Sequence, residues 1–150
     1  MASFPNKSKI HFFFGNVPPV FKKRKKLKKF IDSIFKKEGK KLFTLNFIFC
    51  TDQALLEINC QYLHHDFYTD VISFNLSDSP DEIIADVYIS LDRIRENAES
   101  FKKSIKEELH RVIFHGVLHL CGYQDKISSD KKIMRQKEEI YLNLYFNRFT

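Results

Sequence analysis

The stretch DVISFNLSDSPDEIIADVYISL, residues 70–91, places two predicted strands next to each other in the chain. Residues 70–76 and 83–91 are rich in β-branched and aromatic side chains, which favour extended structure. Between them, the segment SDSPDE has the small, polar and proline residues that are typical of a turn. The sequence therefore predicts a strand, a turn and a second strand in the middle of the chain.

Further regular elements are predicted on both sides of this unit. Residues 9–16 form a short aromatic run closed by Gly-Asn, and residues 42–50 form a longer apolar run, so both predict strands. Residues 20–38 carry apolar side chains at helical spacing and predict an amphipathic helix that ends near Gly39. More helices are predicted over residues 52–63, over residues 92–120 with a pause at 101–104, and from residues 128–130 to about 146.

The predicted order is β-α-β-α-β-β-α-α-α, which fits the α+β class. It corresponds to a four-stranded mixed sheet with about five helices in a single domain that spans residues 1–150. A chain of 150 residues with 43% hydrophobic residues is long and apolar enough for one core. Because no internal repeat or low-complexity linker divides it, a second domain is not expected.

The overall charge and the cysteines limit the kind of protein. The formal net charge of +6 favours a polyanionic partner, although charge alone does not distinguish RNA, DNA and an acidic membrane. The three cysteines have no CxxC spacing, which indicates reduced thiols in a cytosolic protein. No apolar run approaches the roughly 20 residues of a membrane span, and the first residues lack a long apolar stretch. We therefore expect a cytoplasmic protein that is neither secreted nor inserted in a membrane.

A possible metal site lies in the segment FHGVLHLCGYQD, residues 114–125. His115 and His119 are four residues apart, which places two imidazoles one turn apart on one face of a helix. Gly122 can end that helix, and Asp125 follows where the chain turns back. Two imidazoles and one carboxylate around an ion leave a fourth position for water, as in catalytic zinc sites. The alternative is a pair of hydrogen-bonded histidines in the core.

The residue after the first histidine limits the reaction that such a site could catalyse. Zinc peptidases of the H-E-x-x-H type carry a glutamate there as the general base, whereas this chain has Gly116. A peptidase is therefore disfavoured. Cleavage of a phosphodiester is favoured instead, because a metal ion stabilises charge on phosphoryl oxygens and a basic protein attracts the polyanion.

Three segments resemble motifs of the YbeY family, in the family's order: INCQYLHHDFYTDVISF (58–74), ADVYIS (85–90) and HGVLHLCGYQDK (115–126). The last is similar to the family signature His-Gly-x-Leu-His-Leu-x-Gly-Tyr-Asp-His. The resemblance implies a zinc-dependent endoribonuclease that acts on single-stranded RNA in 16S rRNA 3′-end processing, ribosome maturation and quality control. It also implies rRNA and the 30S or 70S ribosome as partners, and we expect a monomer.

The resemblance assigns ligands for one Zn²⁺ ion. It gives His115 and His119 directly, and it places Asp125 where the family usually has a third histidine. A carboxylate lowers the net charge of the metal centre by one relative to an imidazole, so the zinc is expected to be a weaker Lewis acid. The pH–rate profile should therefore lie at higher pH than that of an Asp125→His variant. A lower apparent pKa in the wild type than in the variant would contradict this expectation.

Leu63 is a second departure from the family pattern, which has an arginine at this position. A leucine cannot hold a phosphate, so His65, or its neighbour His64, becomes the candidate proton donor or phosphate partner. Both could equally be exposed loop histidines. Together with the ligand His115, His65 forms the predicted catalytic pair. Arg111, one turn before His115, could also supply charge, although a surface arginine is the simpler interpretation.

Other functions stay open at this level. The chain could be a ribosome-assembly factor that binds RNA and uses zinc only for structure, an alternative that Leu63 favours, or a zinc hydrolase with another substrate. The basic segment KKRKKLKK, residues 22–29, could contact RNA phosphates or could form a solvated helix face. Cys121 is expected to pack rather than to bind metal, because it points about 200° away from His119 around the helix.

Overall fold

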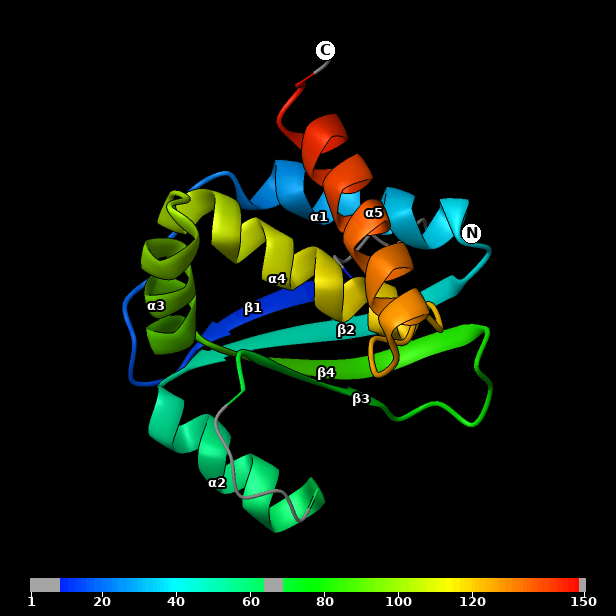
Figure 1. The fold of residues 1–150 in the computed structure, drawn as a ribbon. Coiled ribbons are helices and arrows are strands. Elements are labelled where there is room, and N and C mark those ends of the chain that lie inside the picture. Colours follow the sequence, from blue (N-terminus) through cyan, green and yellow to red (C-terminus); the bar gives the residue numbers. More distant parts are fainter. Residues whose placement is uncertain (1–8, 64–68, 149–150) are drawn as a thin grey trace, which may run out of the picture.

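The computed structural model describes residues 9–63 and 69–148, and the structural statements below are limited to them. Within these residues four strands and five helices follow the predicted order, so the α+β fold with a four-stranded mixed sheet is confirmed (Figure 1). The elements are β1 (Ile10–Phe14), α1 (Arg24–Lys37), β2 (Lys41–Cys50), α2 (Asp52–Leu63), β3 (Val71–Asn75), β4 (Glu82–Ser90), α3 (Leu91–Phe101), α4 (Ile105–Leu120) and α5 (Ser128–Tyr145).

The sheet has the strand order β1-β2-β4-β3. β1, β2 and β4 are parallel, whereas β3 runs antiparallel to β4 and forms one edge of the sheet. The antiparallel pair is the one joined by a short turn, with Ile72 opposite Tyr88. Parallel strands need a longer crossover connection, and here β1 is joined to β2 through α1, and β2 to β4 through α2 and β3.

Helices cover both faces of the sheet: α1, α3, α4 and α5 lie on one face and α2 lies on the other (Figure 1). The core under the four helices contains the fully buried rings of Phe35, Phe47, Phe49 and Phe114. A smaller cluster under α2 is built around Leu55. The sheet is therefore the middle layer, and α4 is held on it from one side with α5 packed against α4.

The break between α3 and α4 follows local sequence signals. Lys102 takes a left-handed conformation with φ of 54°, which ends α3. The Ser104 hydroxyl then accepts a hydrogen bond from the N–H of Glu107 and caps the start of α4. The pause predicted at residues 101–104 is therefore confirmed.

The start of α1 differs from the prediction. The helix begins at Arg24, whereas the apolar spacing predicted a start near Val20. Val20 and Phe21 pack against the core from outside the helix. Their spacing therefore reflects burial of an irregular segment and not an additional helical turn.

The helices are also informative about membranes. α5 is the longest described helix, with 18 residues, and it carries charged side chains along most of its length. Among the described residues, no helix combines the length and the apolar character that crossing a bilayer requires.

Candidate metal centre

The candidate site lies toward the C-terminal end of α4, where this helix packs against β3 and β4. The rings of His115 and His119 have centroids 4.5 Å apart. Gly116 lies against the sheet, and a Cβ atom built there would be 3.0 Å from Cγ1 of Val87 and 3.4 Å from the Ser73 hydroxyl. The helix approaches the strands so closely that a side chain as large as glutamate has no room after the first histidine. This is a physical reason for the absence of the peptidase base.

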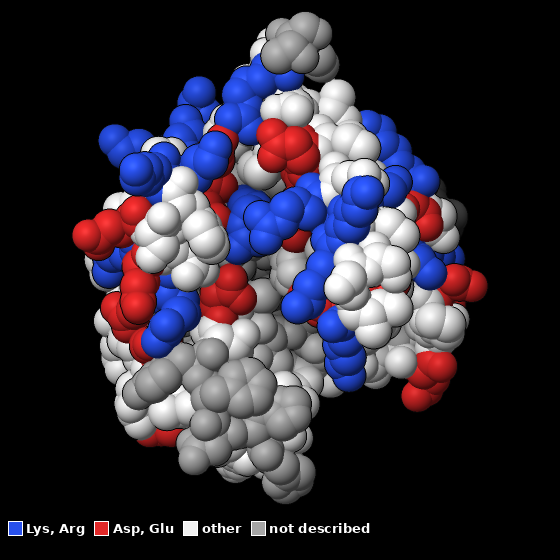
Figure 2. Space-filling model, viewed as in Figure 1, with Lys and Arg blue, Asp and Glu red and all other residues white. Residues whose placement is uncertain are grey.

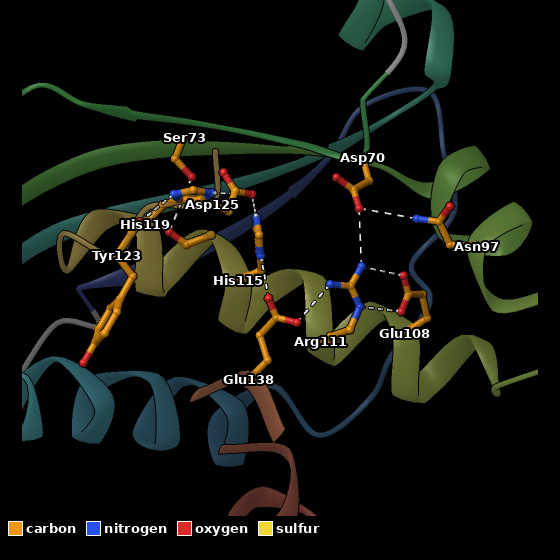
Figure 3. A network of polar contacts seen from close by, with 11 residues as sticks. Asp70, Ser73, Asn97, Glu108, Arg111, His115, His119, Tyr123, Asp125 and Glu138 are labelled. Atoms are coloured by element: carbon orange, nitrogen blue, oxygen red, sulfur yellow. Dashed lines mark hydrogen bonds and ion pairs between the residues drawn. The ribbon is translucent and has the colours of Figure 1, made fainter. Parts of the chain in front are cut away.

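The turn after α4 returns Asp125 to the two histidines (Figure 3). Gly122 allows the turn with a φ of 104°, a conformation that other residues rarely adopt. One carboxylate oxygen of Asp125, Oδ2, lies 3.2 Å from Nε2 of His115 and 3.4 Å from Nε2 of His119. The structure thus brings the three predicted ligands together, with one ligand atom from each residue within 4.8 Å of the others.

The other ring nitrogen of each histidine has an acceptor as its partner. Nδ1 of His115 lies 2.6 Å from the Glu138 carboxylate, and Nδ1 of His119 lies 2.9 Å from the backbone carbonyl of Tyr123. In the neutral form that metal binding requires, each Nδ1 therefore carries the proton and each Nε2 turns a lone pair toward Asp125. Burial, and to a smaller degree the neighbouring His115, lower the pKa of His119 and favour this neutral form.

This arrangement fits a bound divalent cation. Two lone pairs and a carboxylate oxygen that converge in this way repel one another unless a positive charge lies among them. Ligand bonds of about 2.0–2.1 Å in a tetrahedron separate neighbouring ligand atoms by about 3.4 Å, close to the 3.2 and 3.4 Å seen from Asp125. The side chains of His115, His119 and Asp125 are 14%, 26% and 39% exposed, so they do not form a histidine pair enclosed in the core.

Glu138, on α5, connects His115 to a buried ion network (Figure 3). Its second oxygen accepts a hydrogen bond from Arg111 at 3.1 Å, and Arg111 also donates to both oxygens of Glu108 at 2.7 and 2.8 Å. Burial acts to raise the pKa of Glu138, but the hydrogen bond from His115 and the charge and hydrogen bond of Arg111 outweigh it, and the pKa is lowered. Glu138 is therefore ionised, and it holds the His115 ring in one orientation.

The interpretation of Arg111 as a surface arginine is wrong. Its side chain is only 20% exposed, and it lies 3.5 Å from a carboxylate oxygen of Asp70 in addition to its two glutamate partners. Burial acts to lower its pKa, but Glu108 and Glu138 raise it above the usual value. Because three carboxylates surround its guanidinium, Arg111 is a structural cation and is not free to bind a phosphate.

A second group of polar side chains supports the turn after α4. Glu38, just after α1, accepts hydrogen bonds from the hydroxyls of Tyr123 at 2.8 Å and Tyr141 at 2.7 Å. Lys137 lies 3.4 Å from the same carboxylate. Burial acts to raise the pKa of Glu38, but the two tyrosine hydrogen bonds and Lys137 lower it. Tyr123 is thus anchored through its side chain while its backbone carbonyl contacts His119.

A hollow of about 450 Å³ lies beside His119. Its walls come from α2, β3 and the turn after α4, and they include Asn59, Ser73 and Lys126. Leu63 is part of the same wall. The position at which the family pattern has an arginine therefore faces the candidate site, but in this chain its side chain is apolar and supplies no charge.

A smaller hollow of about 240 Å³ lies beside His115 and Asp125. Lys131 and Arg135, from the first half of α5, line it, and neither forms an ion pair within the described ranges. Figure 2 shows basic side chains over α5, around a hollow near the centre of this face. This wall therefore presents two basic side chains without an ion-pair partner next to the three converging residues.

Two further sequence predictions concern His65 and Cys121. His65 lies outside the described residues, so its predicted role is not tested. Cys121 does not take part in the group of converging ligand atoms, and it packs against the core, where burial raises the pKa of its thiol to about 12. Its predicted packing role is confirmed.

Sequence reasoning missed Glu38 and Glu138. One feature of the sequence could have identified Glu138. It lies in the otherwise apolar, buried stripe of α5, one turn after Met134 and one turn before Tyr141. A lone acidic residue in such a stripe indicates a buried partner. No feature of the sequence indicated Glu38, since a glutamate at the end of a lysine-rich helix is usual on a protein surface.

Comparisons with known proteins show which family this chain is similar to. The family model described as Endoribonuclease YbeY matches residues 17–145. A relative from Cytophaga hutchinsonii, named Endoribonuclease YbeY, is 42% identical over 135 residues, which are 90% of this chain and 94% of the relative. A relative of the same name from Flavobacterium psychrophilum is 53% identical over 115 residues, which are 77% of this chain and 81% of the relative.

A solved structure is similar as well. The solution structure of TM1509 from Thermotoga maritima matches with a TM-score of 0.62 and 29% sequence identity, over 92% of this chain and 89% of that chain. The family model covers the α4 histidines together with most of the sheet and helices that position them. This chain therefore belongs to the endoribonuclease YbeY family.

Proposed function

We propose that this chain is a zinc-dependent endoribonuclease that cleaves single-stranded RNA. Its relatives carry the name Endoribonuclease YbeY, and its net charge of +6 suits a polyanionic substrate. The observation that carries the proposal is the convergence of His115, His119 and Asp125 on a common point. The whole chain, residues 1–150, is proposed to form one domain of this family.

Zinc fits the three ligands best. Two imidazoles and one carboxylate, with one position left for substrate or water, form a common ligand set of catalytic zinc. Magnesium and calcium prefer sites made of oxygen ligands, so two imidazoles disfavour them. When bound, zinc supplies a Lewis acid for a phosphoryl oxygen and lowers the pKa of a water molecule.

The hollows beside the ligands are proposed to hold the RNA backbone. Lys126 lines the hollow beside His119, and Lys131 and Arg135 line the one beside His115. Basic side chains on both sides of the ligands can contact the phosphates that flank the scissile bond. These three residues would then supply the positive charge that Leu63, at the family's arginine position, does not.

His65 is proposed as the proton donor to the leaving oxygen. Leu63 and Thr69, the described residues nearest to it on either side in the chain, both line the hollow beside His119. A histidine suits this role because its ordinary pKa lies near neutral pH.

The biological role is proposed from the family. We propose that the chain acts in the cytoplasm as a monomer in late 16S rRNA 3′-end processing, ribosome maturation and quality control. Its partners would be rRNA and the 30S or 70S ribosome.

A ribosome-assembly factor with a structural zinc is the second candidate. The observation that favours it is Leu63, which leaves one wall of the hollow beside His119 without the family's cation. Such a factor would bind RNA and zinc but would cleave little or no RNA.

The test combines metal analysis with a cleavage assay. Bound metal is measured by mass spectrometry, and cleavage is measured with a labelled single-stranded RNA, for the wild type, His115→Ala and His11→Ala. His11 is an exposed histidine on β1 and serves as the matched control. An endoribonuclease should lose bound zinc and cleavage in His115→Ala and keep both in His11→Ala.

The same assay distinguishes the alternatives. His65→Ala should lower the cleavage rate by about 10²-fold if His65 donates a proton, while His64→Ala should not. A wild-type protein that binds zinc and RNA without cleaving would support the assembly factor. Cleavage that persists undiminished in His115→Ala would contradict the proposed active site.

A further inference from the structure

A cavity of about 450 Å³ lies on a different side of α4 from the candidate metal centre. It is bordered by the residues at the start of α1, the first turns of α4 and the end of α5, and no residue that lines it lines the hollows beside the metal ligands. On α4, Lys106 and His110 line this cavity, whereas His115 and His119 belong to the metal site. His110 and His115 point about 140° apart around the helix, at about 100° per residue. The cavity is therefore a separate place on the molecule.

The lining of this cavity is basic and contains no acidic residue. Four lysines take part in it: Lys22, Lys23, Lys26 and Lys106. None of the four forms an ion pair within the part of the chain that the structure describes. Nζ of Lys26 lies 4.5 Å from the ring centroid of Tyr145, and Nζ of Lys106 lies 5.5 Å from that of Phe146. These cation–π contacts hold two ammonium groups at the wall, where they attract an anion.

Aromatic rings form much of the remaining wall. Phe21 and Phe146 are partly exposed, and Tyr145 is buried beside them. The ring of His110 stacks on Tyr145 with centroids 5.0 Å apart and an interplanar angle of 27°. Aromatic side chains next to basic ones are the combination with which proteins hold single-stranded nucleic acid, because bases pack on the rings and phosphates contact the cations.

His110 adds a hydrogen-bond acceptor to the wall. Its side chain is only 3% exposed, and its Nδ1 lies 2.7 Å from the backbone carbonyl of Lys106, so Nδ1 carries the proton. Burial lowers the pKa of His110, although the contact with that carbonyl acts against it, and the ring is neutral. Its Nε2 forms no hydrogen bond within the described ranges, and because no buried side-chain nitrogen or oxygen lacks a partner there, this atom is open to solvent and can accept a hydrogen bond. A phosphodiester or a carboxylate has no hydrogen to donate to it, whereas a base amino group or a ribose hydroxyl does.

We propose that this basic–aromatic cavity, lined by Lys22, Lys23, Lys26, Lys106, His110 and the rings of Phe21, Tyr145 and Phe146, is a second binding site for single-stranded RNA. Backbone phosphates contact the lysines, a base packs against the partly exposed ring of Phe21 or Phe146, and a donor on the base or ribose meets His110. The site increases affinity for RNA and takes no part in cleavage. It rests on the proposed function only in that the bound chain is RNA.

The proposal also resolves the two interpretations of the basic segment 22–29. Lys22, Lys23 and Lys26 line the cavity, whereas Lys25 and Lys29 do not. The segment is therefore divided into lysines that contact RNA and lysines that form a solvated face, and this division provides a matched control.

The experiment measures the affinity of the full chain, as purified, for a short fluorescein-labelled oligouridylate by fluorescence anisotropy, with the probe checked for integrity on a gel. Lys26→Ala/Lys106→Ala is compared with Lys25→Ala/Lys29→Ala, which removes the same charge outside the cavity. The first pair should weaken binding about tenfold at low salt and reduce the dependence of log Kd on log salt by about 1.4, from about 0.7 per phosphate contact. The second pair should change the affinity by less than about twofold.

His110→Phe gives an independent readout, because it keeps a ring against Tyr145 and removes the acceptor. Binding should weaken about fivefold with an unchanged salt dependence. An equal loss in the two double-lysine variants would show a general effect of charge and would overturn the proposal. Polyglutamate that competes as well as unlabelled oligouridylate would overturn it in favour of a site for acidic protein segments.

The failure of this proposal is distinguishable from the failure of the proposed function. With a cleavable RNA, Lys26→Ala/Lys106→Ala should raise KM and leave kcat and bound metal unchanged. Lack of cleavage by the wild type would contradict the proposed function and leave the binding difference between the two lysine pairs measurable.

Discussion

The two histidines of the candidate metal centre are oriented by partners of different kinds. Nδ1 of His115 is 2.6 Å from the carboxylate of Glu138, which lies 23 residues later in the chain on α5. Nδ1 of His119 is 2.9 Å from the backbone carbonyl of Tyr123, only 4 residues later. The first contact is charge-assisted and belongs to a buried ion network, whereas the second is neutral and made by the backbone (Figure 3).

This difference determines how each imidazole can be disturbed. A single substitution can remove the carboxylate of Glu138, but no side-chain substitution removes the carbonyl of Tyr123. Hydrogen bonds to ionised groups are roughly twice as strong as neutral ones, and a carboxylate partner also makes the imidazole a better ligand. We therefore expect His115 to be the stronger ligand and the more vulnerable one, and His119 to be the more robust.

Replacing Glu138 with glutamine tests the charged contact, which joins Nδ1 of His115 to the Glu138 carboxylate. The amide keeps the shape of the side chain but loses the charge that orients His115 and neutralises Arg111. We expect the affinity for zinc to fall by about 10- to 100-fold. The free energy of unfolding of the metal-free protein should fall by about 3 kcal/mol, because Arg111 is left with one buried partner fewer. Competition with a chromophoric chelator and urea denaturation measure the two effects.

Glu139→Gln is the matched control for this prediction. Glu139 is the next residue of α5 and is exposed, so its replacement should change neither the zinc affinity nor the stability. If Glu138→Gln bound zinc as tightly as the wild type, the Nδ1 partner of His115 would be irrelevant to the site.

Gly116→Ala tests a feature that both histidines share, the position of α4 on the sheet. In an exposed helix this substitution stabilises a protein by about 1 kcal/mol. Here the new methyl group would lie 3.0 Å from Cγ1 of Val87, so the Val87 side chain or the helix has to yield by a few tenths of an ångström. We expect a net loss of about 1–2 kcal/mol in the free energy of unfolding, measured by thermal denaturation. An increase in Tm would show that α4 is not packed closely on β4.

The contrast between the two histidines also explains how much of the site the sequence could predict. His115, His119, Gly122 and Asp125 lie in one short segment, so helical spacing and a helix-ending glycine were enough to predict that they meet. Glu138 meets His115 only because α5 packs on α4, and no local pattern contains that packing. The convergence of ligands from one segment was therefore predictable, whereas the contact of a ligand with a distant segment was not.

The fold divides in a similar way. Each strand and helix has its own periodicity, so their order along the chain was predictable from local patterns. The strand order β1-β2-β4-β3 depends on how the connecting helices cross the sheet, which local periodicity does not encode. The start of α1 was misplaced for a related reason, because Val20 and Phe21 are apolar through contacts with the core and not through helix formation.

Glu38→Gln tests the neutral contact, which joins Nδ1 of His119 to the backbone carbonyl of Tyr123. Glu38 anchors the side chain of Tyr123 but does not touch His119, and the backbone carbonyl of Tyr123 remains after the substitution. We expect zinc affinity to stay within about twofold of the wild type and the free energy of unfolding at neutral pH to fall by about 1 kcal/mol. The same chelator competition and urea denaturation apply, which makes the result directly comparable with that of Glu138→Gln.

The stability difference between the wild type and Glu38→Gln should also depend on pH. The folded-state pKa of Glu38 is lowered from its ordinary value of 4.5, so its contribution to stability is fully present above that value and is lost as the pH falls through the folded-state pKa. Urea denaturation at a series of pH values should show a constant difference near neutral pH that shrinks below about pH 4.5. Tyr123→Phe, which removes one hydrogen bond to the carboxylate, should reproduce part of the effect. If Glu38→Gln instead lowered zinc affinity as much as Glu138→Gln does, the backbone contact of His119 would depend on the tyrosine anchor, and the two histidines would not differ in the way their partners indicate.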